Sequence, residues 1–256
     1  RMRAVVLVKY VPAPQGTPTM GPDHLLVRDV PDGTLDPGDE YAVEQALRLV
    51  EAQGGEVTLV SMGPAAAQAA LRKGLSMGAS KGVLISDPAL RGADVLATAK
   101  VLAAAVRAEG FDLVLGGVES TDGYTGTLPI AVAELLGVPG LTFARAISVD
   151  GGVARVERQT EGGYDVVEAP LPALITVTGS ADEPRYPTLK GIMASKQKPV
   201  EERSLADLGL AAADVAPTQS VAAVREAPGR QAGEIVGAED GPRRIADLLA
   251  DAKVLR

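Results

Sequence analysis

The sequence predicts an α/β protein built on a doubly wound, mostly parallel sheet, with antiparallel additions and a C-terminal tail. Residues 4–8 form a continuous apolar run, which is typical of a strand covered on both faces. Residues 39–55 carry a helical stripe of apolar side chains that ends at glycines. The same strand–helix unit recurs over residues 1–140 with short glycine-rich joints, which predicts right-handed crossovers and a parallel sheet.

The elements can be assigned in chain order. The expected strands are 4–8, 56–63, 82–87 and 111–117, and the expected helices are 39–55, 64–79, 94–110 and 127–137. From about residue 141 the apolar runs shorten and lose the helical stripe, which predicts antiparallel hairpins with strands at 142–149, 152–158 and 164–168. Residues 200–236 show weak periodicity, and 241–256 predict a short amphipathic helix. We therefore expect an α/β domain over 1–199 and an extended arm over 200–256.

Composition excludes several classes of function. The chain has 25 basic and 33 acidic residues and a formal net charge of -8, which argues against binding to duplex DNA or an anionic membrane. Cysteine is absent and His24 is the single histidine, so disulfides, thiolate nucleophiles and cysteine-type zinc sites are excluded. Carboxylate, lysine or tyrosine chemistry stays open. We expect no metal site, and if the protein takes part in catalysis we expect a bound cofactor to carry the chemistry.

The sequence also bears on location. No stretch approaches the roughly 18 apolar residues that a membrane span needs. The basic and apolar start, "RMRAVVLVKYV", is followed by a polar, proline-rich loop and not by a signal-peptide cleavage pattern. We therefore expect a cytoplasmic protein without membrane insertion.

A candidate binding crevice follows from the predicted sheet. In such sheets ligands bind beyond the carboxyl ends of the strands, near the switch in strand order. The segments after Val8, Met62, Asp87 and Gly117 should converge there. Residues 117–125 follow a buried strand and precede a helix, so their backbone N–H groups and hydroxyls could bind a phosphate.

The alternative for residues 117–125 is an ordinary Asp-Gly turn, because the loop matches neither a dinucleotide-binding nor a Walker pattern. Asp122 could cap the following helix or hold a ribose hydroxyl. Met62 could equally be a core methionine. The candidate residues are Lys9, Asp36, Pro37, Gly38, Asp39, Met62, Gly63, Gly117, Val118, Glu119, Ser120, Thr121, Asp122, Gly123, Tyr124 and Thr125.

A second candidate site is the segment 184–198, which we call the recognition segment. Its apolar residues are bracketed by prolines and lysines, in "PRYPTLKGIMASKQK". Pro184 and Pro187 favour an extended backbone and oppose an early helix, so a loop is expected. An apolar centre inside a charged rim is typical of a partner-binding anchor. The alternative is a crossover whose apolar residues pack on their own domain. The candidates are Arg185, Tyr186, Leu189, Ile192, Met193 and Lys196.

Together these segments resemble the beta subunit of the electron transfer flavoproteins. The resemblance is carried by "VLVKYVP", "LDPGDEYAVEQALRL", "VSMGPA", "DLVLGG" with "STDG", and above all "DEPRYPTLKGIMASKQKP". Order and spacing agree over about residues 2–210. The tail beyond carries no motif.

The resemblance implies an adenine nucleotide alpha hydrolase-like fold and a heterodimer whose alpha subunit holds most of the FAD. It implies an AMP bound at Leu7, Asp36 to Asp39, Met62 and Gly117 to Thr125. It also implies that Leu189 inserts into an apolar pocket of an acyl-CoA-type or related dehydrogenase, as in fatty acid oxidation, and that the arm 200–256 docks on the alpha subunit. Gly123 and Tyr124 stand where mitochondrial members have an Asn-Gln pair, which affects the expected phosphate contacts.

Two alternatives stay open at this point. One is a subunit of an electron-bifurcating flavoprotein with a second FAD in place of AMP. The other is a stand-alone adenine-nucleotide-binding module, which would have no alpha partner and no flavin. The nucleotide content of the purified protein separates the three.

Overall fold

A computed structural model describes residues 1–13, 18–28, 30, 32–225, 227–229 and 232–254. The chain divides into two compact units, Arg1–Ala222 and Ala223–Arg256. The first part of the predicted arm, 200–222, therefore belongs to the larger unit. The last two residues of the predicted terminal helix, 255 and 256, lie outside the described residues.

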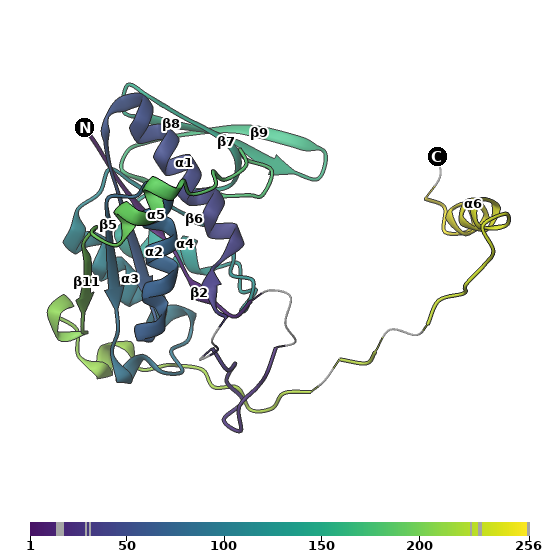
Figure 1. The fold of residues 1–256 in the computed structure, drawn as a ribbon, viewed down its shortest axis with the longest axis horizontal. Helices are drawn as coiled ribbons and strands as arrows, with labels where there is room; N and C mark the ends of the chain where they lie inside the picture. Colours follow the sequence, from purple (N-terminus) through teal and green to yellow (C-terminus); the bar gives the residue numbers. More distant parts are fainter. Residues whose placement is uncertain (14–17, 29, 31, 226, 230–231, 255–256) are drawn as a thin grey trace. The chain divides into compact units, whose positions relative to one another are not determined.

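The larger unit contains strands and helices in alternation (Figure 1). The strands are β1 (Met2–Leu7), β2 (Tyr10–Val11), β3 (Thr34–Leu35), β4 (Gly55–Met62), β5 (Lys81–Ile85), β6 (Leu113–Gly117), β7 (Gly140–Asp150), β8 (Val153–Thr160), β9 (Gly163–Pro170), β10 (Ala173–Val177) and β11 (Val200–Arg203). The helices are α1 (Pro37–Gln53), α2 (Gln68–Met77), α3 (Val95–Glu109), α4 (Leu128–Leu136) and α5 (Leu189–Ser195).

The described part of the larger unit is organised around a nine-stranded sheet in the order β11-β5-β4-β1-β6-β10-β7-β8-β9. The strands from β11 to β7 are parallel to their neighbours, and β7, β8 and β9 form an antiparallel ribbon. The α/β class and the mostly parallel sheet predicted from the sequence are confirmed. The chain leaves β1 toward β4 on one side and returns to β6 on the other, so the switch in strand order lies between β1 and β6.

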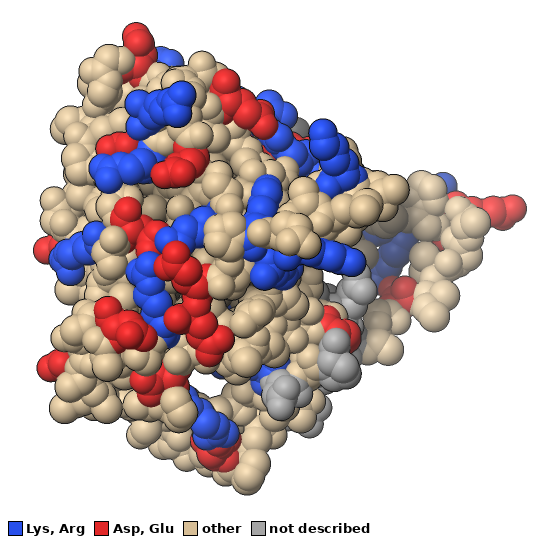
Figure 2. All heavy atoms as spheres, turned by 60° about the vertical axis from the view of Figure 1, so that its left-hand side comes forward, with Lys and Arg blue, Asp and Glu red and all other residues tan. Residues whose placement is uncertain are grey.

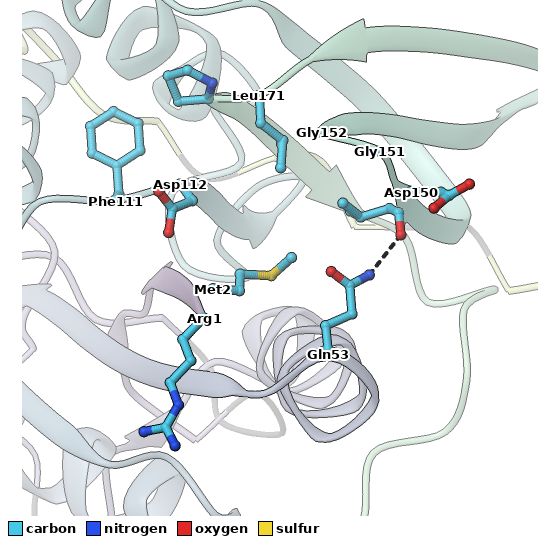
Figure 3. Close-up of a pocket in the computed structure, with 11 residues that line it drawn as sticks. Arg1, Met2, Gln53, Phe111, Asp112, Asp150, Gly151, Gly152 and Leu171 are labelled. Carbon is cyan, nitrogen blue, oxygen red and sulfur yellow. Dashed lines mark hydrogen bonds between the residues drawn. The ribbon is translucent and has the colours of Figure 1, made fainter.

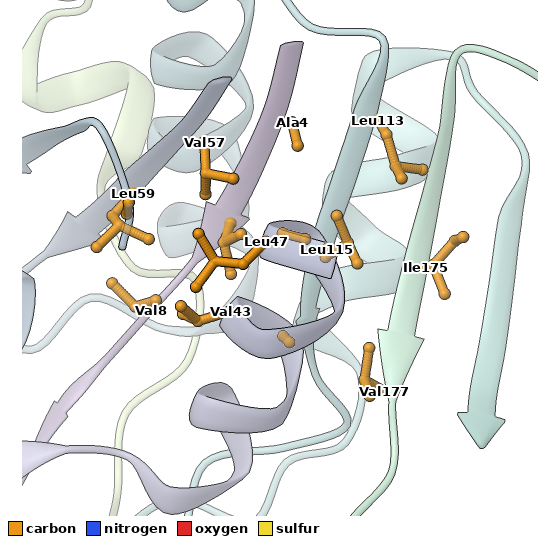
Figure 4. Close-up of a cluster of buried hydrophobic side chains, with 14 of the residues drawn as sticks. Ala4, Val8, Val43, Leu47, Val57, Leu59, Leu113, Leu115, Ile175 and Val177 are labelled. Atoms are coloured by element: carbon orange, nitrogen blue, oxygen red, sulfur yellow. The ribbon is translucent and has the colours of Figure 1, made fainter. Parts of the chain in front are cut away.

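Apolar side chains pack on both faces of the sheet, which explains the continuous apolar runs of the strands. One cluster joins Ala4 and Leu59 of the sheet to Val43 and Leu47 of α1 and to α2 (Figure 4). The other joins alternate residues of the same strands, such as Val5, to α3 and α4. The central strands β1, β4, β5, β6 and β10 bury residues on both faces, so their sequences are mostly apolar, whereas β7, β8 and β9 expose many of their residues.

Three elements differ from the sequence-based expectations. No strand was assigned at 173–177 in the region expected to be antiparallel, but these residues form β10, which is parallel and lies between β6 and β7. The recognition segment was expected to be a loop, yet it contains the short helix α5, which begins two residues after Pro187. Residues 200–203 form the edge strand β11, which pairs with β5.

The smaller unit contains the helix α6 (Gly241–Asp251), close to the predicted terminal helix. Its apolar residues Ile245, Leu248 and Leu249 recur at helical spacing and have exposed side chains. Arg244 and Glu234 form an ion pair within the unit at 2.9 Å.

Candidate functional site

The candidate site lies at the carboxyl ends of β1 and β6, where the strand order switches. Three segments meet there: Lys9 after β1, the N-terminus of α1 at Asp36, and the loop 117–125 after β6. Direct hydrogen bonds join them, although they are far apart in the sequence. The structure therefore brings together most of the polar residues that the sequence singled out.

Asp39 links the carboxyl ends of β1 and β6. Its Oδ2 accepts a hydrogen bond from the backbone N–H of Lys9 at 2.8 Å, and its Oδ1 accepts one from Gly117 at 3.1 Å. The residue is only 8% exposed. Burial, and after it the nearby charge of Asp36, raises the pKa of Asp39 to about 8, while the two backbone hydrogen bonds act in the opposite direction.

Asp36 connects α1 to the loop after β6. As the N-cap residue of α1 it accepts a hydrogen bond from the Gly38 N–H at 2.8 Å. Its other oxygen accepts bonds from the backbone N–H and the hydroxyl of Thr121, at 2.7 and 2.8 Å. Asp36 is fully buried, so this double role fixes the position of the loop relative to α1.

Asp122 is held by two cations. Lys9 Nζ lies 2.7 Å from one carboxylate oxygen and Arg28 Nε lies 2.6 Å from the other. Burial opposes ionisation here, but Lys9 and Arg28 hold the pKa of Asp122 below its usual range. Lys9 Nζ also donates to Ser120 Oγ at 3.2 Å. The sequence analysis missed Arg28, which lies in the proline-rich segment before α1.

Asp122 does not cap α4, although the sequence allowed that role. The N-cap residue of α4 is Thr127, and no side chain there makes a capping hydrogen bond. In the loop 117–125, most backbone N–H groups, those of Val118 and Gly123 among them, make no hydrogen bond to another described residue. Hydrogen-bond donors are thus available beside a helix N-terminus, where an anion is stabilised.

Other predicted residues take less direct positions. The Leu7 side chain is buried in the apolar cluster beneath α3, so only its backbone faces the crevice end of β1. Met62 ends β4 and packs partly on the same cluster. Pro37 occupies the first turn of α1, and the Gly63 N–H bonds to the carbonyl of Ile85. Tyr124 and Thr125 are exposed, and Tyr124 has a φ of 48°.

The recognition segment presents apolar side chains to solvent. Leu189 is 75% exposed and Met193 64%, and the neighbouring side chains of Tyr186 and Ile192 are exposed as well. Lys196 is exposed at the end of α5. The alternative, in which these residues pack on their own domain, therefore does not hold for the side chains of Leu189, Ile192 and Met193.

Arg185 is engaged within the chain. Its Nε lies 2.8 Å from Glu44 Oε2 and its Nη1 lies 2.5 Å from Glu51 Oε1, both on α1. The hydrogen bonds that Arg185 donates to Glu51 and then to Glu44 raise the pKa of Arg185. Glu44 and Glu51 are seven residues apart and so occupy the same helix face two turns apart. The sequence analysis did not identify either carboxylate.

Comparisons with known proteins identify the family of the chain. The family model of the electron transfer flavoprotein domain matches residues 24–208, well over half of the chain. The chain is a member of the electron transfer flavoprotein family. It is 40% identical over 262 aligned residues to the electron transfer flavoprotein subunit beta of Mycobacterium tuberculosis, with 98% of each chain covered. It is 36% identical to the subunit of the same name in Bacillus subtilis, over 86% of this chain and 88% of the relative.

A third relative of the chain has a different name. The acryloyl-CoA reductase electron transfer subunit gamma of Anaerotignum propionicum is 38% identical over 203 residues, which cover 78% of this chain and 76% of the relative. The resemblance found in the sequence is therefore confirmed, and the chain is an electron transfer flavoprotein subunit of the beta type.

Three further observations concern metal ligands, surface charge and membrane spans in this flavoprotein family member. No group of His, Asp and Glu side chains among the described residues is arranged to hold a metal ion. On the face that carries α2, α5 and β11, charged side chains of both signs alternate without a large basic patch (Figure 2). None of the helices in the described ranges is long and apolar enough to cross a membrane.

A pocket of about 590 Å³ opens at the opposite end of the parallel strands, where they begin (Figure 3). Met2, Phe111 and Leu171 line it, and these residues lie at or just before the amino ends of β1, β6 and β10. Gln53 closes one side by donating a hydrogen bond to the Val149 carbonyl at 2.6 Å. Because ligands of doubly wound sheets bind at the carboxyl ends, this pocket is separate from the candidate site.

The raised pKa of Asp39 predicts a specific dependence of stability on pH. The folded carboxyl keeps its proton up to about pH 8, whereas the unfolded one loses it near pH 4. The folded state thus binds more protons than the unfolded state between these pH values. The stabilising contribution of the protonated Asp39 carboxyl to the free energy of unfolding is therefore full below about pH 4 and is lost as pH rises toward 8. We expect the free energy of unfolding to fall between pH 5 and 8 by at least about 1 kcal/mol more than in Asp39→Asn. Urea denaturation of both proteins checks this, and parallel pH profiles would contradict it.

Proposed function

We propose that this chain is the beta subunit of a heterodimeric electron transfer flavoprotein that binds AMP in the crevice and positions FAD together with an alpha subunit. The observation that carries the proposal is the convergence of Lys9, Asp36 and Asp39 on the loop 117–125 at the switch point of the sheet. The confirmed family supplies the flavin context. FAD, when bound, accepts and donates the electrons, so no side chain of this chain acts as acid, base or nucleophile.

The crevice residues suit an adenine mononucleotide. The free N–H groups of the loop 117–125 and the N-terminus of α4 would hold the phosphate, and the hydroxyls of Ser120 and Thr125 could add donors. Lys9 and Arg28 offset the charge of Asp122. The exposed Glu119 is the remaining carboxylate of this loop, and it would face away from the phosphate. Met62 at the end of β4 would contact the base. These assignments support AMP and leave the bifurcating alternative to experiment.

The proposed partners follow from the two exposed apolar surfaces. Leu189, Ile192 and Met193 would enter a pocket of an acyl-CoA-type or related dehydrogenase, with Tyr186 and Lys196 at the rim. The name of the Anaerotignum propionicum relative, an electron transfer subunit of an acyl-CoA reductase, supports a partner of this chemical class. The part of the predicted arm outside the larger unit, 223–256 with its amphipathic helix α6, would dock on the alpha subunit. We place the assembly in the cytoplasm.

The proposal is tested by the nucleotides that the protein releases. The chain is purified alone and with its alpha subunit, denatured, and the released nucleotides are separated by chromatography and identified by absorbance. We expect one AMP per chain in both preparations and one FAD only in the heterodimer. A second FAD in place of AMP would instead support the electron-bifurcating subunit. AMP without any stable alpha complex would support a stand-alone nucleotide-binding module, and the absence of both nucleotides would contradict the crevice assignment.

A further inference from the structure

The helix α5 is not held in place by burial of its large apolar side chains. It has only seven residues, fewer than an isolated helix needs to be stable in water. Its large apolar side chains point to solvent, and of its residues only Ser195 is buried. The contacts that keep α5 in place must therefore be polar or made by its backbone.

Those contacts come from α2, against which α5 lies (Figure 1). Arg72 of α2 donates from Nη1 to the carbonyl of Ser195 at 2.6 Å and to that of Lys198 at 2.7 Å. Lys198, just after α5, donates from Nζ to the carbonyls of Leu75 at 2.9 Å and Ala79 at 2.6 Å. At the C-terminus of each helix, one carbonyl within the last turn and one just beyond it are thus bound by a cation of the other segment.

The two helices also touch closely. A Cβ atom on Gly191 would lie 2.5 Å from the backbone oxygen of Ser76, so only glycine allows this approach. Thr188 caps the start of α5, because its hydroxyl accepts a hydrogen bond from the Gly191 N–H at 3.0 Å. At the beginning of the recognition segment, Arg185 is bound by Glu44 and Glu51 of α1. The segment is therefore fixed at both ends, and its apolar residues project from the middle.

We propose that Arg72 and Lys198 are positioning residues that hold α5 in the conformation that docks on the dehydrogenase. This inference rests on the proposed docking function of the recognition segment. A partner that binds a preformed helix does not have to order it, and an ordered anchor therefore binds with higher affinity. The two residues do not enter the partner's pocket. They act through the backbone of α5 and so set the affinity of the carrier for the dehydrogenase.

The test uses the reconstituted heterodimer and a purified acyl-CoA dehydrogenase reduced by its acyl-CoA substrate. Arg72→Met and Lys198→Met keep most of the aliphatic stem and remove the donors. We expect each to raise the KM for the carrier about tenfold with kcat and AMP content unchanged, because only the docking conformation is less populated. Amide hydrogen exchange in 189–195 should become faster. Arg72→Lys, which keeps a cation, should restore part of the affinity.

A matched control lies on the other face of the sheet. Lys100 of α3 also donates to a backbone carbonyl, that of Asp214 at 3.0 Å, and Lys100→Met should leave KM unchanged. Combining Arg72→Met with Leu189→Ala should give less than the product of the two single effects, because both act on one contact.

The outcomes distinguish the positioning role of Arg72 and Lys198 from the docking function of the recognition segment. A normal KM for both methionine variants, with a raised KM for Leu189→Ala, would overturn the positioning role and leave docking intact. A normal KM for Leu189→Ala would overturn docking itself. A raised KM that comes with lost AMP and a lower midpoint of urea unfolding would show a general folding defect and would also overturn the positioning role.

Discussion

Replacing Leu189 by alanine is expected to raise the KM for the carrier in dehydrogenase-coupled reduction by roughly 30- to 150-fold, with little change in kcat. The side chain is 75% exposed in the free subunit and would be buried in the proposed complex. An apolar anchor that fills a partner's pocket contributes about 2–3 kcal/mol to binding, and truncation to alanine removes that contribution. Stopped-flow measurement of flavin reduction at varied carrier concentration gives both constants.

The same substitution should leave the subunit folded. An exposed side chain away from buried contacts changes the free energy of unfolding by no more than about 0.5 kcal/mol. Leu96 on α3 is a matched control, because it is also a partly exposed leucine on a helix but lies far from the recognition segment in the sequence. Equal KM values for Leu189→Ala and Leu96→Ala would contradict a docking role for α5.

The parts of the fold that the sequence predicts correctly depend on local patterns. The apolar run at 4–8 and the stripe at 39–55 each report burial directly, and they give β1 and α1 nearly at their observed limits. The carboxyl ends of parallel strands lie at the same end of a sheet whatever the strand order, so Lys9 and the loop after β6 could be expected to lie close together without knowledge of which strands are neighbours. Asp36 and Asp39 were candidates for a different reason, as part of a turn directly before the first helix.

What the sequence did not predict depends on distant pairings. The buried run at 173–177 gives no sign of its place between β6 and β7, because strand order follows from contacts across the whole chain. Arg28 and Asp122 are 94 residues apart, and a cation in a proline-rich loop carries no periodic signal. From the sequence alone, Arg185 was interpreted as a charge at the rim of a docking surface. Its partner Glu44 is 141 residues away, so the sequence did not show that the two side chains pair.

The helix α5 was missed for a different reason. Its seven residues are too few to show a helical stripe, and the two prolines before it argue for extended backbone. The available signal was Thr188 as a capping residue directly after Pro187. Its stability comes from Arg72 and Lys198, whose contacts with backbone carbonyls leave no pattern in a sequence.

Replacing Gly117 by alanine is expected to destabilise the subunit by about 2–4 kcal/mol and to abolish retention of AMP. A Cβ atom at this position would lie 2.7 Å from Asp39 Oδ1 and 3.1 Å from the backbone carbon of Gly38. Neither neighbour can move easily, because Asp39 is bound to both strand ends and Gly38 lies in the first turn of α1. Overpacking of this kind costs about 1–3 kcal/mol, and the loss of the Asp39 hydrogen bond to Gly117 adds about 1 kcal/mol.

The effect on AMP follows because the displaced residues are the ones that fix the loop. If α1 moves away from β6, Asp36 no longer bonds to Thr121, and the loop loses the contact that fixes it to α1. Gly116→Ala is the matched control on the same strand, since its Cβ would meet only ordinary contacts, the nearest at 3.7 Å to Leu7. Urea denaturation and the released nucleotide should therefore change strongly in Gly117→Ala and far less in Gly116→Ala. Full AMP retention in Gly117→Ala would show that contact between α1 and β6 does not shape the nucleotide site.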